Sequence, residues 1–557
     1  MVLEKSDYVR NVFAHFIRSH PFLTLCLIGS LVCFIGISNE LWTPDEPRDA
    51  AIGRAMWESG DWIVPRLNGD PFLEKPPFYW WAQSALFALF GRATPTLARL
   101  PSAVFGFAAL LLTYFLGRRF FSPQTCLVGC LILLSTALFS ITTHWIVVDN
   151  ALLFAVTGAW AFFTQSETRS SAARQFLLLG MYVFLAIAFL AKGLVGLGIP
   201  ALGMSVYLLW NRRLGRFFGW HILLGGVLIG GAAVLWLWLL WREGGRASLN
   251  TFLIYNQFGR FFPDAETYQG GHVRPVWYYL LNTPVDLLPW TPFVLLAGLS
   301  AWRNWGRLPE VHREGIKFCI AGTLSVFLVL SLAGTKRGMY LLPVFPLIAL
   351  FVASWAVSTG QSYGWQNKLE RGWEIFLIVC AALSPVTVFL APATWPFWLI
   401  SVVVLYFFCY VFRNPPTADR EIRLLRTAFV VCLAIVNLLI TVRPFVDRFK
   451  SFVPFVRQIE EHVSPAQTLY AYRPDETTLG VVNFYTGRQL REIAPAQLAS
   501  MAREQTEFSL IVRDSKRTGG NYGEIVKAGI PHRLLAEQIV GDDRTLRILA
   551  VGNGIKQ

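Results

Sequence analysis

Charged residues are scarce in this chain of 557 residues, and none of its cysteines lies in a polar segment. Only 15% of the residues are charged and 54% are hydrophobic, whereas soluble domains carry about a quarter charged residues. No Walker motif or GxGxxG fingerprint occurs, so the sequence predicts no nucleotide and does not support ATP-driven transport. A disulfide framework or thiolate zinc site is not indicated, because every cysteine falls in an apolar run: Cys26, Cys33, Cys126, Cys130, Cys319, Cys380, Cys409 and Cys432.

Long apolar segments dominate what is present. We interpret the first, residues 21–38, as a retained anchor, because it is too long for a signal-peptide core. The sequence predicts a polytopic α-helical membrane protein with about thirteen transmembrane helices. The expected spans are 21–38, 99–117, 124–143, 149–165, 175–191, 193–210, 219–241, 277–301, 315–333, 340–357, 374–391, 395–412 and 427–443.

The net charge of +14 comes from basic residues in short loops, a pattern that sets membrane orientation and argues against nucleic-acid binding. If the short apolar segment 78–91 lies along the interface, alternate loops collect nearly all the arginines. The positive-inside rule places those loops in the cytoplasm. The loops 39–98 and 243–276, the Asp149, Lys192 and Lys336 junctions and the C-terminal tail then face the non-cytoplasmic side.

The chain changes character near residue 448. We divide it into a membrane domain, residues 1–447, and a small α/β domain, residues 448–557. β-Branched and aromatic runs predict strands at 468–472, 481–485, 508–512 and 546–550. Residues 495–505 and 523–528 are expected to be helical, the first with a proline in its first turn.

Acidic residues lie at two junctions on the predicted non-cytoplasmic side. Asp45 and Glu46 follow the first span, and a carboxylate there is able to act as a general base, hold a divalent cation or orient a sugar hydroxyl. The alternative is a solvated loop acid. Asp149 lies at the mouth of a span, where an ionisable group points to function, although aspartate is also a common helix N-cap.

Basic residues gather on the same side, against the positive-inside trend, and anionic substrate phosphates would explain them. The residues are Lys75, Lys192, Arg260, Arg274 and Lys336. Competing interpretations are a surface ion pair for Glu74 and Lys75 and a snorkelling side chain for Lys192. His272 is most often just a loop histidine, and with Glu74 it could form part of a metal site, which is a weak signal by itself.

An ordered set of motifs resembles a known family. The set comprises Pro44-Asp45-Glu46-x-Arg48, residues 59–65, Glu74-Lys75-Pro76, Asp149, residues 190–193 and Lys336-x-x-x-Tyr340-x-Leu342-Pro343. Across the whole membrane region the chain resembles the bacterial aminoarabinose transferases of lipid A modification and the wider protein O-mannosyltransferase-like GT-C glycosyltransferases. These transferases usually continue Asp-Glu-x-Arg with tyrosine, where this chain has Asp49, which leaves the donor sugar and the lipid A acceptor open.

The resemblance implies a GT-C fold, a periplasmic α/β tail and a set of site residues. It makes Asp45 the first catalytic acid and Asp149 the second, with Glu46 beside them. The implied phosphate-binding residues are Arg48, Lys75, Lys192, Arg260, Arg274, Lys336 and Tyr340. Glu74 and His272 resemble a metal pair, which implies a divalent metal such as zinc.

The resemblance also implies partners and a location. We expect a monomeric, multi-pass glycosyltransferase of the bacterial inner membrane, with its active site in the periplasm. The expected partners are a polyprenyl-phosphate-linked sugar and lipid A or another periplasmic acceptor. A protein O-mannosyltransferase-like enzyme is the first alternative. A lipid-linked-sugar transporter ranks behind it, because transporters place key polar groups near the bilayer midplane.

Overall fold

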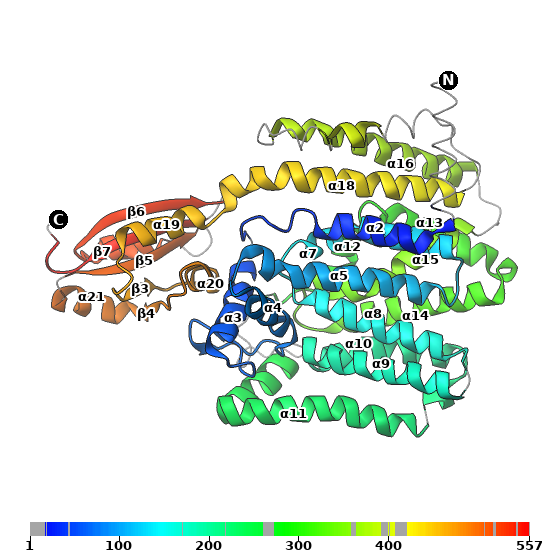
Figure 1. Cartoon of the computed structure of the whole chain (residues 1–557), viewed down its shortest axis with the longest axis horizontal. Helices are drawn as coiled ribbons and strands as arrows, with labels where there is room; N and C mark the ends of the chain where they lie inside the picture. The colour runs from blue at the N-terminus through cyan, green and yellow to red at the C-terminus, as the bar shows by residue number, and fades with distance from the viewer. Residues whose placement is uncertain are drawn as a thin grey trace. The chain divides into compact units, whose positions relative to one another are not determined.

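The computed structural model describes residues 17, 19–42, 45–169, 171–217, 219–259, 272–357, 364–390, 399, 401–406, 420–505, 507–515, 520–541 and 544–555 (Figure 1). The chain folds into two compact units. Unit 1 comprises Met1–Gly36, Leu73–Phe78 and Pro101–Val442, and unit 2 comprises Ile37–Phe72, Tyr79–Leu100 and Arg443–Gln557. The expected domain boundary at residue 447 lies inside one long helix, α18 (Arg420–Lys450).

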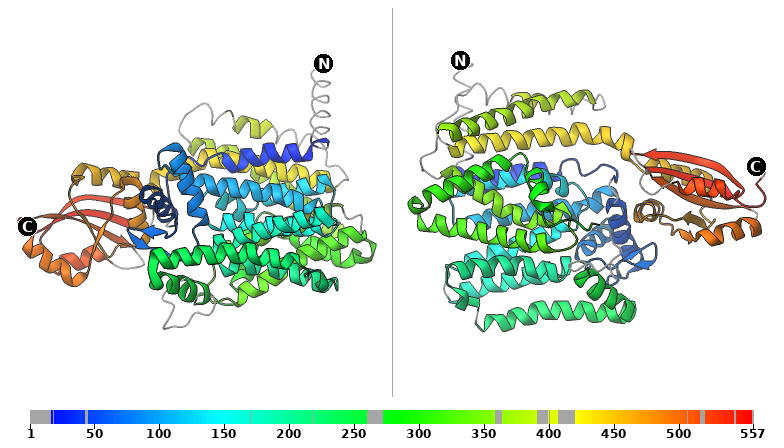
Figure 2. Two further views of the ribbon diagram at one scale, coloured as in Figure 1. Left: turned by 60° about the horizontal axis from the view of Figure 1, so that its bottom comes forward. Right: turned by 180° about the vertical axis from the view of Figure 1, so that it is seen from behind.

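Unit 1 is helical. Its helices are α2 (Pro21–Phe34), most of α5 (Pro95–Gly117), α6 (Pro123–Leu134), α7 (Ala137–Thr143), α8 (Asp149–Ser166), α9 (Ser171–Lys192), α10 (Leu194–Trp210), η1 (Leu214–Phe217), α11 (His221–Asn250), η2 (Thr251–Phe258), α12 (Tyr278–Asp286), α13 (Thr291–Asn304), η3 (Trp305–Arg307), α14 (Glu310–Leu332), η4 (Gly338–Val344), α15 (Phe345–Val357), α16 (Gly364–Leu383), η5 (Ser384–Leu390) and the first part of α18. Helices α8, α9 and α10 pack side by side (Figures 1 and 2).

Aromatic side chains fill the centre of this bundle. The Phe318 ring lies 5.1 Å from the Tyr207 ring and 6.2 Å from the Trp160 ring, both in edge-to-face geometry. Trp160 is fully buried, and its indole N–H donates to the Pro200 carbonyl oxygen at 3.1 Å. Because Pro200 lies inside α10, its missing N–H and its ring disturb the helical bonding there. The hydrogen bond to Pro200 therefore satisfies the indole N–H and fixes α8 against α10.

The expected count of thirteen spans is not confirmed. Six helices of the described residues are long and apolar enough to cross a membrane, or eight if two bent pairs each count as one span. The pair α6 and α7 bends by 71° and the pair α12 and α13 by 105°. Helices α2 and α10 are apolar but shorter, and the expected span 395–412 lies mostly outside the described residues. The chain is nevertheless a multi-pass membrane protein.

The first bend has an identifiable cause. The hydroxyl groups of Ser135 and Thr136 donate to the carbonyl oxygens of Leu131 and Leu133, at 2.6 and 2.9 Å. Ser135 also accepts a hydrogen bond from the Trp290 indole at 2.9 Å. Such back-bonding competes with the helical ladder and bends it. A hydropathy pattern cannot show this, because both residues sit inside one continuous apolar run.

Unit 2 combines three helices that follow the first span with an α/β sheet. The elements are α3 (Asp45–Ser59), β1 (Arg66–Leu67), β2 (Asp70–Pro71), α4 (Phe78–Phe90), the start of α5, the end of α18, α19 (Val453–His462), β3 (Leu469–Tyr472), α20 (Glu476–Thr486), β4 (Arg491–Ile493), α21 (Pro495–Glu504), β5 (Phe508–Ser515), α22 (Asn521–Lys527), β6 (His532–Val540) and β7 (Arg544–Val551). Helix α4, the segment expected at the interface, has 13 residues, fewer than the roughly 20 that a span needs.

The five-stranded sheet has the order β4-β3-β5-β7-β6. Strand β3 pairs in parallel with β4 and β5, whereas β7 pairs antiparallel with β5 and β6. Alternate residues of β5, Phe508, Leu510 and Val512, share a core with Leu498 of α21 and Ile525 of α22. This alternation places one face of the sheet under these two helices.

The strand predicted at 481–485 is wrong, because these residues lie within helix α20. Two local signals favour the helix. The Asp475 side chain caps its start by accepting from the Thr478 backbone N–H at 2.9 Å, and Gly487 ends it in the left-handed conformation, with φ 71°. Gly480 faces α3 so closely that a Cβ there would come within 2.5 Å of the Arg48 nitrogen. The sequence analysis also missed β4 and β6.

Candidate active site

Unit 1 places the second predicted acid at the first turn of α8. Asp149 is 2% exposed, and its carboxylate forms an ion pair with the Lys192 ammonium group at the end of α9. The same ammonium group lies 3.9 Å from the centre of the Tyr340 ring. Three predicted site residues are therefore brought together from elements far apart in sequence. The N-cap alternative for Asp149 does not describe its position, because Val148 occupies the N-cap.

A pocket opens beside this ion pair. It has a cavity volume of about 60 Å³, and its polar lining comes from Glu74, Lys75, Lys192, Asn256, Gln257, Thr335 and Tyr340. The volume exceeds the roughly 15 Å³ that one water needs. Lys75 is buried and has no salt-bridge partner among the described residues. The pocket therefore presents to a ligand one lysine that is paired with Asp149, one lysine that makes no salt bridge among the described residues, and the Glu74 carboxylate.

The glycine after Lys192 is required by the backbone. Gly193 has φ 63°, a conformation that favours glycine, and the Gln257 side chain occupies the space where a Cβ would be. The side-chain amide oxygen of Gln257, Oε1, accepts a hydrogen bond from the Leu194 backbone N–H at 2.9 Å. This contact fastens the start of α10 to η2 at the edge of the pocket. Gln257 was missed by the sequence analysis, because an isolated loop amide carries no motif.

We expect Gly193→Ala to lower the free energy of unfolding by about 2–3 kcal/mol, from the left-handed backbone and the lost hydrogen bond together. Thermal unfolding of the purified protein measures this. Gly198→Ala is the matched control on the same helix, because no atom lies within 4 Å of its added Cβ. Equal stability of Gly193→Ala and wild type would contradict the contact described.

Two further predicted phosphate-binding residues, Arg274 and Lys336, form a separate cluster. The Lys336 ammonium group donates to the carbonyl oxygens of Arg274 (2.9 Å) and Ala333. Burial lowers the pKa of Lys336 below its ordinary value. The Lys336 N–H also donates to the His272 carbonyl oxygen at 2.9 Å, and Val273 bridges to Thr335. Lys336 thus anchors this segment beside Thr335, a lining residue of the pocket. Arg260 lies outside the described residues.

The predicted metal pair has only part of a ligand set. Glu74 lines the pocket, whereas His272 lies on the exposed segment that Lys336 holds. Within the described part of the chain no group of three or more His, Cys, Asp and Glu residues forms. A structural metal site needs about four ligands, so the donors present do not complete one. The pair Glu74 and His272 stays a prediction, and no chemical step below depends on it.

Unit 2 holds the first predicted acid at the start of α3. The Asp45 carboxylate keeps 26% of its surface exposed and pairs with Arg48 at 3.1 Å. Arg48 also contacts Asp49 at 3.2 Å and Glu476 at 2.8 Å, and lies over the Phe72 ring. Three carboxylates therefore surround this guanidinium group. Arg48 therefore positions Asp45, and its contact with a phosphate stays a prediction.

Asp49, the departure from the family motif, has its own partners. Its carboxylate accepts from the Trp80 indole N–H at 3.2 Å and from Arg48 at 3.2 Å, with 2% of its surface exposed. A phenol could not accept these two charged or polar donors in the same way. The residue therefore fixes the first turns of α3 against α4.

Glu46 is fully buried within unit 2. Its carboxylate forms a two-pronged ion pair with Arg99, at 2.6 and 2.9 Å, and both side chains are fully buried. Arg99 also donates to the carbonyl oxygens of Ile37 (3.3 Å), Asn39 and Glu40 (2.5 Å). This geometry makes Glu46 an anchor for the loop, whereas the sequence placed it among the catalytic residues.

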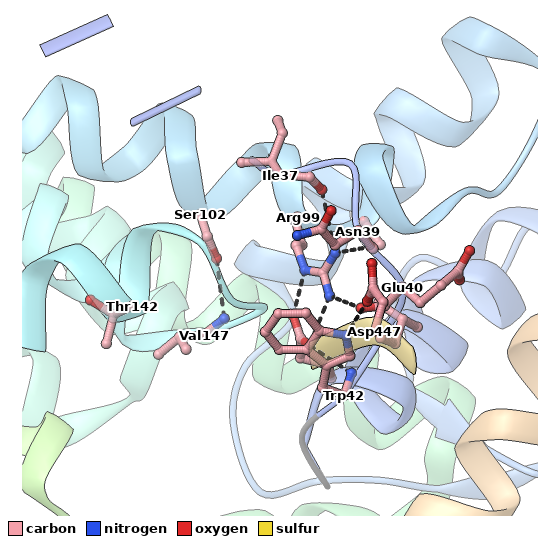
Figure 3. Close-up of polar contacts among 12 residues, drawn as sticks. Ile37, Asn39, Glu40, Trp42, Arg99, Ser102, Thr142, Val147 and Asp447 are labelled. Carbon is pink, nitrogen blue, oxygen red and sulfur yellow. Dashed lines mark hydrogen bonds and ion pairs between the residues drawn. The ribbon is translucent and has the colours of Figure 1, made fainter. Parts of the chain in front are cut away.

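The turn that precedes Asp45 is fixed by further contacts (Figure 3). The Trp42 backbone N–H donates to Glu46 at 3.0 Å, and its indole N–H donates to Asp447. Tyr485 donates to Glu40 at 2.8 Å, and burial with the nearby Glu40 charge raises the Tyr485 pKa well above its ordinary value. These contacts hold the backbone on the N-terminal side of Asp45.

Comparison with known proteins agrees with this architecture. The family model described as dolichyl-phosphate-mannose-protein mannosyltransferase matches residues 74–241, which include Lys75, Asp149 and Lys192. An undecaprenyl phosphate-alpha-4-amino-4-deoxy-L-arabinose arabinosyl transferase of Edwardsiella ictaluri is 29% identical over 386 residues, covering 66% of this chain and 65% of the relative. The protein of that name from Pseudomonas aeruginosa is 30% identical over 373 residues, covering 65% of this chain and 64% of the relative. The match thus spans slightly less than two thirds of these relatives.

Solved structures share the fold. The crystal structure of ArnT from Cupriavidus metallidurans bound to undecaprenyl phosphate superposes with a TM-score of 0.75, at 22% identity, covering 97% of this chain and 99% of ArnT. The oligosaccharyltransferase AglB from Archaeoglobus fulgidus superposes with a TM-score of 0.52, at 12% identity, covering 89% of this chain and 70% of AglB. The resemblance inferred from the sequence is confirmed: the chain is similar in sequence to the aminoarabinose transferases and shares the fold of ArnT.

Proposed function

We propose that this chain is an integral membrane glycosyltransferase that moves an aminoarabinose-like sugar from undecaprenyl phosphate to lipid A or a related periplasmic acceptor. The pocket that contains Lys75 and Lys192 carries the proposal. Among the described residues Lys75 makes no salt bridge, and Glu74 is the one carboxylate that lines the pocket with it. A buried cation is costly unless an anion lies close to it, and a lipid phosphate would supply one. The names of the curated relatives supply the sugar and the carrier.

The proposed chemistry is an inverting displacement at the anomeric carbon. An acceptor oxygen forms the new bond while the bond from the anomeric carbon to the phosphate oxygen breaks, and the electron pair goes to the departing lipid phosphate. Lys75 and Lys192 would stabilise the charge that develops there. Asp149 orients Lys192 through the ion pair. The Asp45 carboxylate retains solvent exposure and stays the predicted general base for a hydroxyl acceptor, whereas an anionic phosphate acceptor needs no base.

The proposal includes an orientation. With the arginine-rich loops in the cytoplasm, the Lys192 end of α9 faces the periplasm of a bacterial inner membrane. Helix α4, too short to cross a bilayer, supports the interfacial placement of 78–91 on which this orientation depends.

We expect Lys75→Gln to reduce sugar transfer by about a hundredfold or more, because one charged donor to the leaving group is removed. The assay follows radiolabelled sugar from undecaprenyl-phosphate donors to lipid A and to membrane protein fractions. Lys527→Gln, at an exposed position at the end of helix α22, controls for the loss of one positive charge. Undiminished transfer by Lys75→Gln would contradict the proposed phosphate site.

The same assay decides between two acceptors. The mannosyltransferase family model favours a protein acceptor as the second candidate. Label in lipid A supports the aminoarabinose-transferase-like function, and label in protein supports the mannosyltransferase-like one. Absence of transfer to either acceptor across a broad donor panel would contradict both and favour a transporter.

A further inference from the structure

A second pocket lies at the opposite end of α9 from Lys192. It has a volume of about 410 Å³, and its lining includes Glu167, Arg169, Arg174, Arg216, Trp220 and His221. From Arg174 to Lys192 the helix rises about 27 Å, at 1.5 Å for each residue. The two pockets therefore lie at opposite ends of a helix that is long and apolar enough to cross a membrane, and the proposed sugar transfer makes no use of this one.

The lining of this second pocket is strongly cationic. Three arginines accompany a single carboxylate, Glu167, which pairs with Arg216 at 2.5 Å. Neither Arg169 nor Arg174 has a carboxylate partner among the described residues. Two guanidinium groups with forked donors are thus left to face the pocket, an arrangement that suits phosphate oxygens.

The walls of the pocket are fixed by contacts within unit 1. The Tyr182 hydroxyl and the His221 ring form a hydrogen bond of 2.9 Å behind it, which joins α9 to α11. Gly225 packs against the Tyr182 ring so closely that a Cβ would overlap it. Helices α9 and α11 both begin beside the pocket, and the positive ends of their dipoles add to the arginine charge.

Three exposed apolar side chains line the pocket or lie within two positions of a lining residue in the sequence. Phe176 is 70% exposed, Trp220 60% and Leu223 74%. A soluble anion would gain nothing from such a rim, whereas a molecule with a phosphate head and hydrocarbon chains would contact both parts. Tryptophan beside basic residues is also typical of the headgroup layer of a membrane.

We propose that this pocket binds the phosphate headgroup of an anionic phospholipid, with Arg169 and Arg174 on the phosphate and the acyl chains along Phe176, Trp220 and Leu223. In the proposed orientation the lipid belongs to the cytoplasmic leaflet. Its binding ties the α8–α9 connection to the start of α11, because residues of both segments line the pocket.

The test uses the full-length protein in detergent at low salt and measures the midpoint of thermal unfolding. The titrants are short-chain phosphatidylglycerol, phosphatidylcholine and inorganic phosphate. Phosphatidylglycerol is expected to raise the midpoint saturably, and the other two to have little effect. Arg174→Gln should weaken the phosphatidylglycerol affinity about tenfold, the loss of one charge-assisted hydrogen bond.

Two further variants complete the design. Gln175→Glu adds a negative charge to the exposed lining without removing a native contact, and is also expected to weaken binding. Arg307→Gln, in a separate basic loop, should bind as wild type does. Unchanged affinity in Arg174→Gln and Gln175→Glu, or equal weakening in Arg307→Gln, would overturn the site. Inorganic phosphate binding as tightly as the lipid would overturn the assignment to a lipid.

Discussion

Replacing Arg99 with methionine is expected to lower the free energy of unfolding by about 3–5 kcal/mol, because it leaves the buried Glu46 carboxylate without its cation. Both side chains are fully buried, and Arg99 additionally holds three backbone carbonyl groups of the segment 37–40. Thermal or denaturant unfolding of the purified protein measures the loss. Sugar transfer should fall with it, since this segment leads into Asp45.

The control for Arg99→Met is Arg533→Met in the same unit. Arg533 pairs with Glu507 at 3.7 Å, but both side chains are mostly exposed, and such pairs contribute less than about 1 kcal/mol. The double variant Glu46→Leu/Arg99→Met should be more stable than Arg99→Met alone, because no unpaired charge remains buried. Similar destabilisation by Arg99→Met and Arg533→Met would show that another cation or water compensates the Glu46 charge.

Replacing Lys192 with methionine is expected to reduce sugar transfer by about a hundred- to a thousandfold, because the leaving phosphate loses a preorganised cation. The variant also leaves Asp149 unpaired at 2% exposure, which destabilises the folded protein. Measuring kcat and KM for the lipid donor together with thermal unfolding separates these two effects.

The double variant Asp149→Asn/Lys192→Met distinguishes chemistry from stability. It removes both charges, so the unfolding midpoint should recover toward wild type while transfer stays low. Lys317→Met is the matched lysine control, since Lys317 contacts Asn211 at 3.1 Å at the arginine-rich end of α14. Recovery of transfer in the double variant would show that Lys192 serves only to neutralise Asp149.

The sequence predicted the helical membrane region well but not its local geometry. Apolar length predicts where a helix lies, and the expected spans from 99 to 357 coincide with helices or bent helix pairs. The bends and the helix α20 depend instead on side-chain hydrogen bonds, such as those of Ser135 and Asp475. These side-chain hydrogen bonds compete with the structure that the hydropathy pattern predicts, and a hydropathy profile does not show them.

The sequence predicted individual residues of the candidate site, but it did not predict which of them pair with one another. Charge at span boundaries singled out Asp149 and Lys192, but their ion pair joins residues 43 positions apart. Glu46 and Arg99 show the converse. Arg99 stands at the start of an apolar run, where an ionisable residue calls for a partner, and asking for that partner would have separated Glu46 from the catalytic acids.

The ion pair of Lys192 with Asp149 also bears on turnover. After transfer, the spent carrier phosphate holds more negative charge than the donor had. The Lys192 ammonium group is able to re-form its ion pair with Asp149, so the Asp149 carboxylate competes with the spent carrier phosphate for this ammonium group. We infer that this competition speeds the dissociation of the spent carrier phosphate, because Lys75 is then its one remaining counter-ion. The pocket is then free for the next donor.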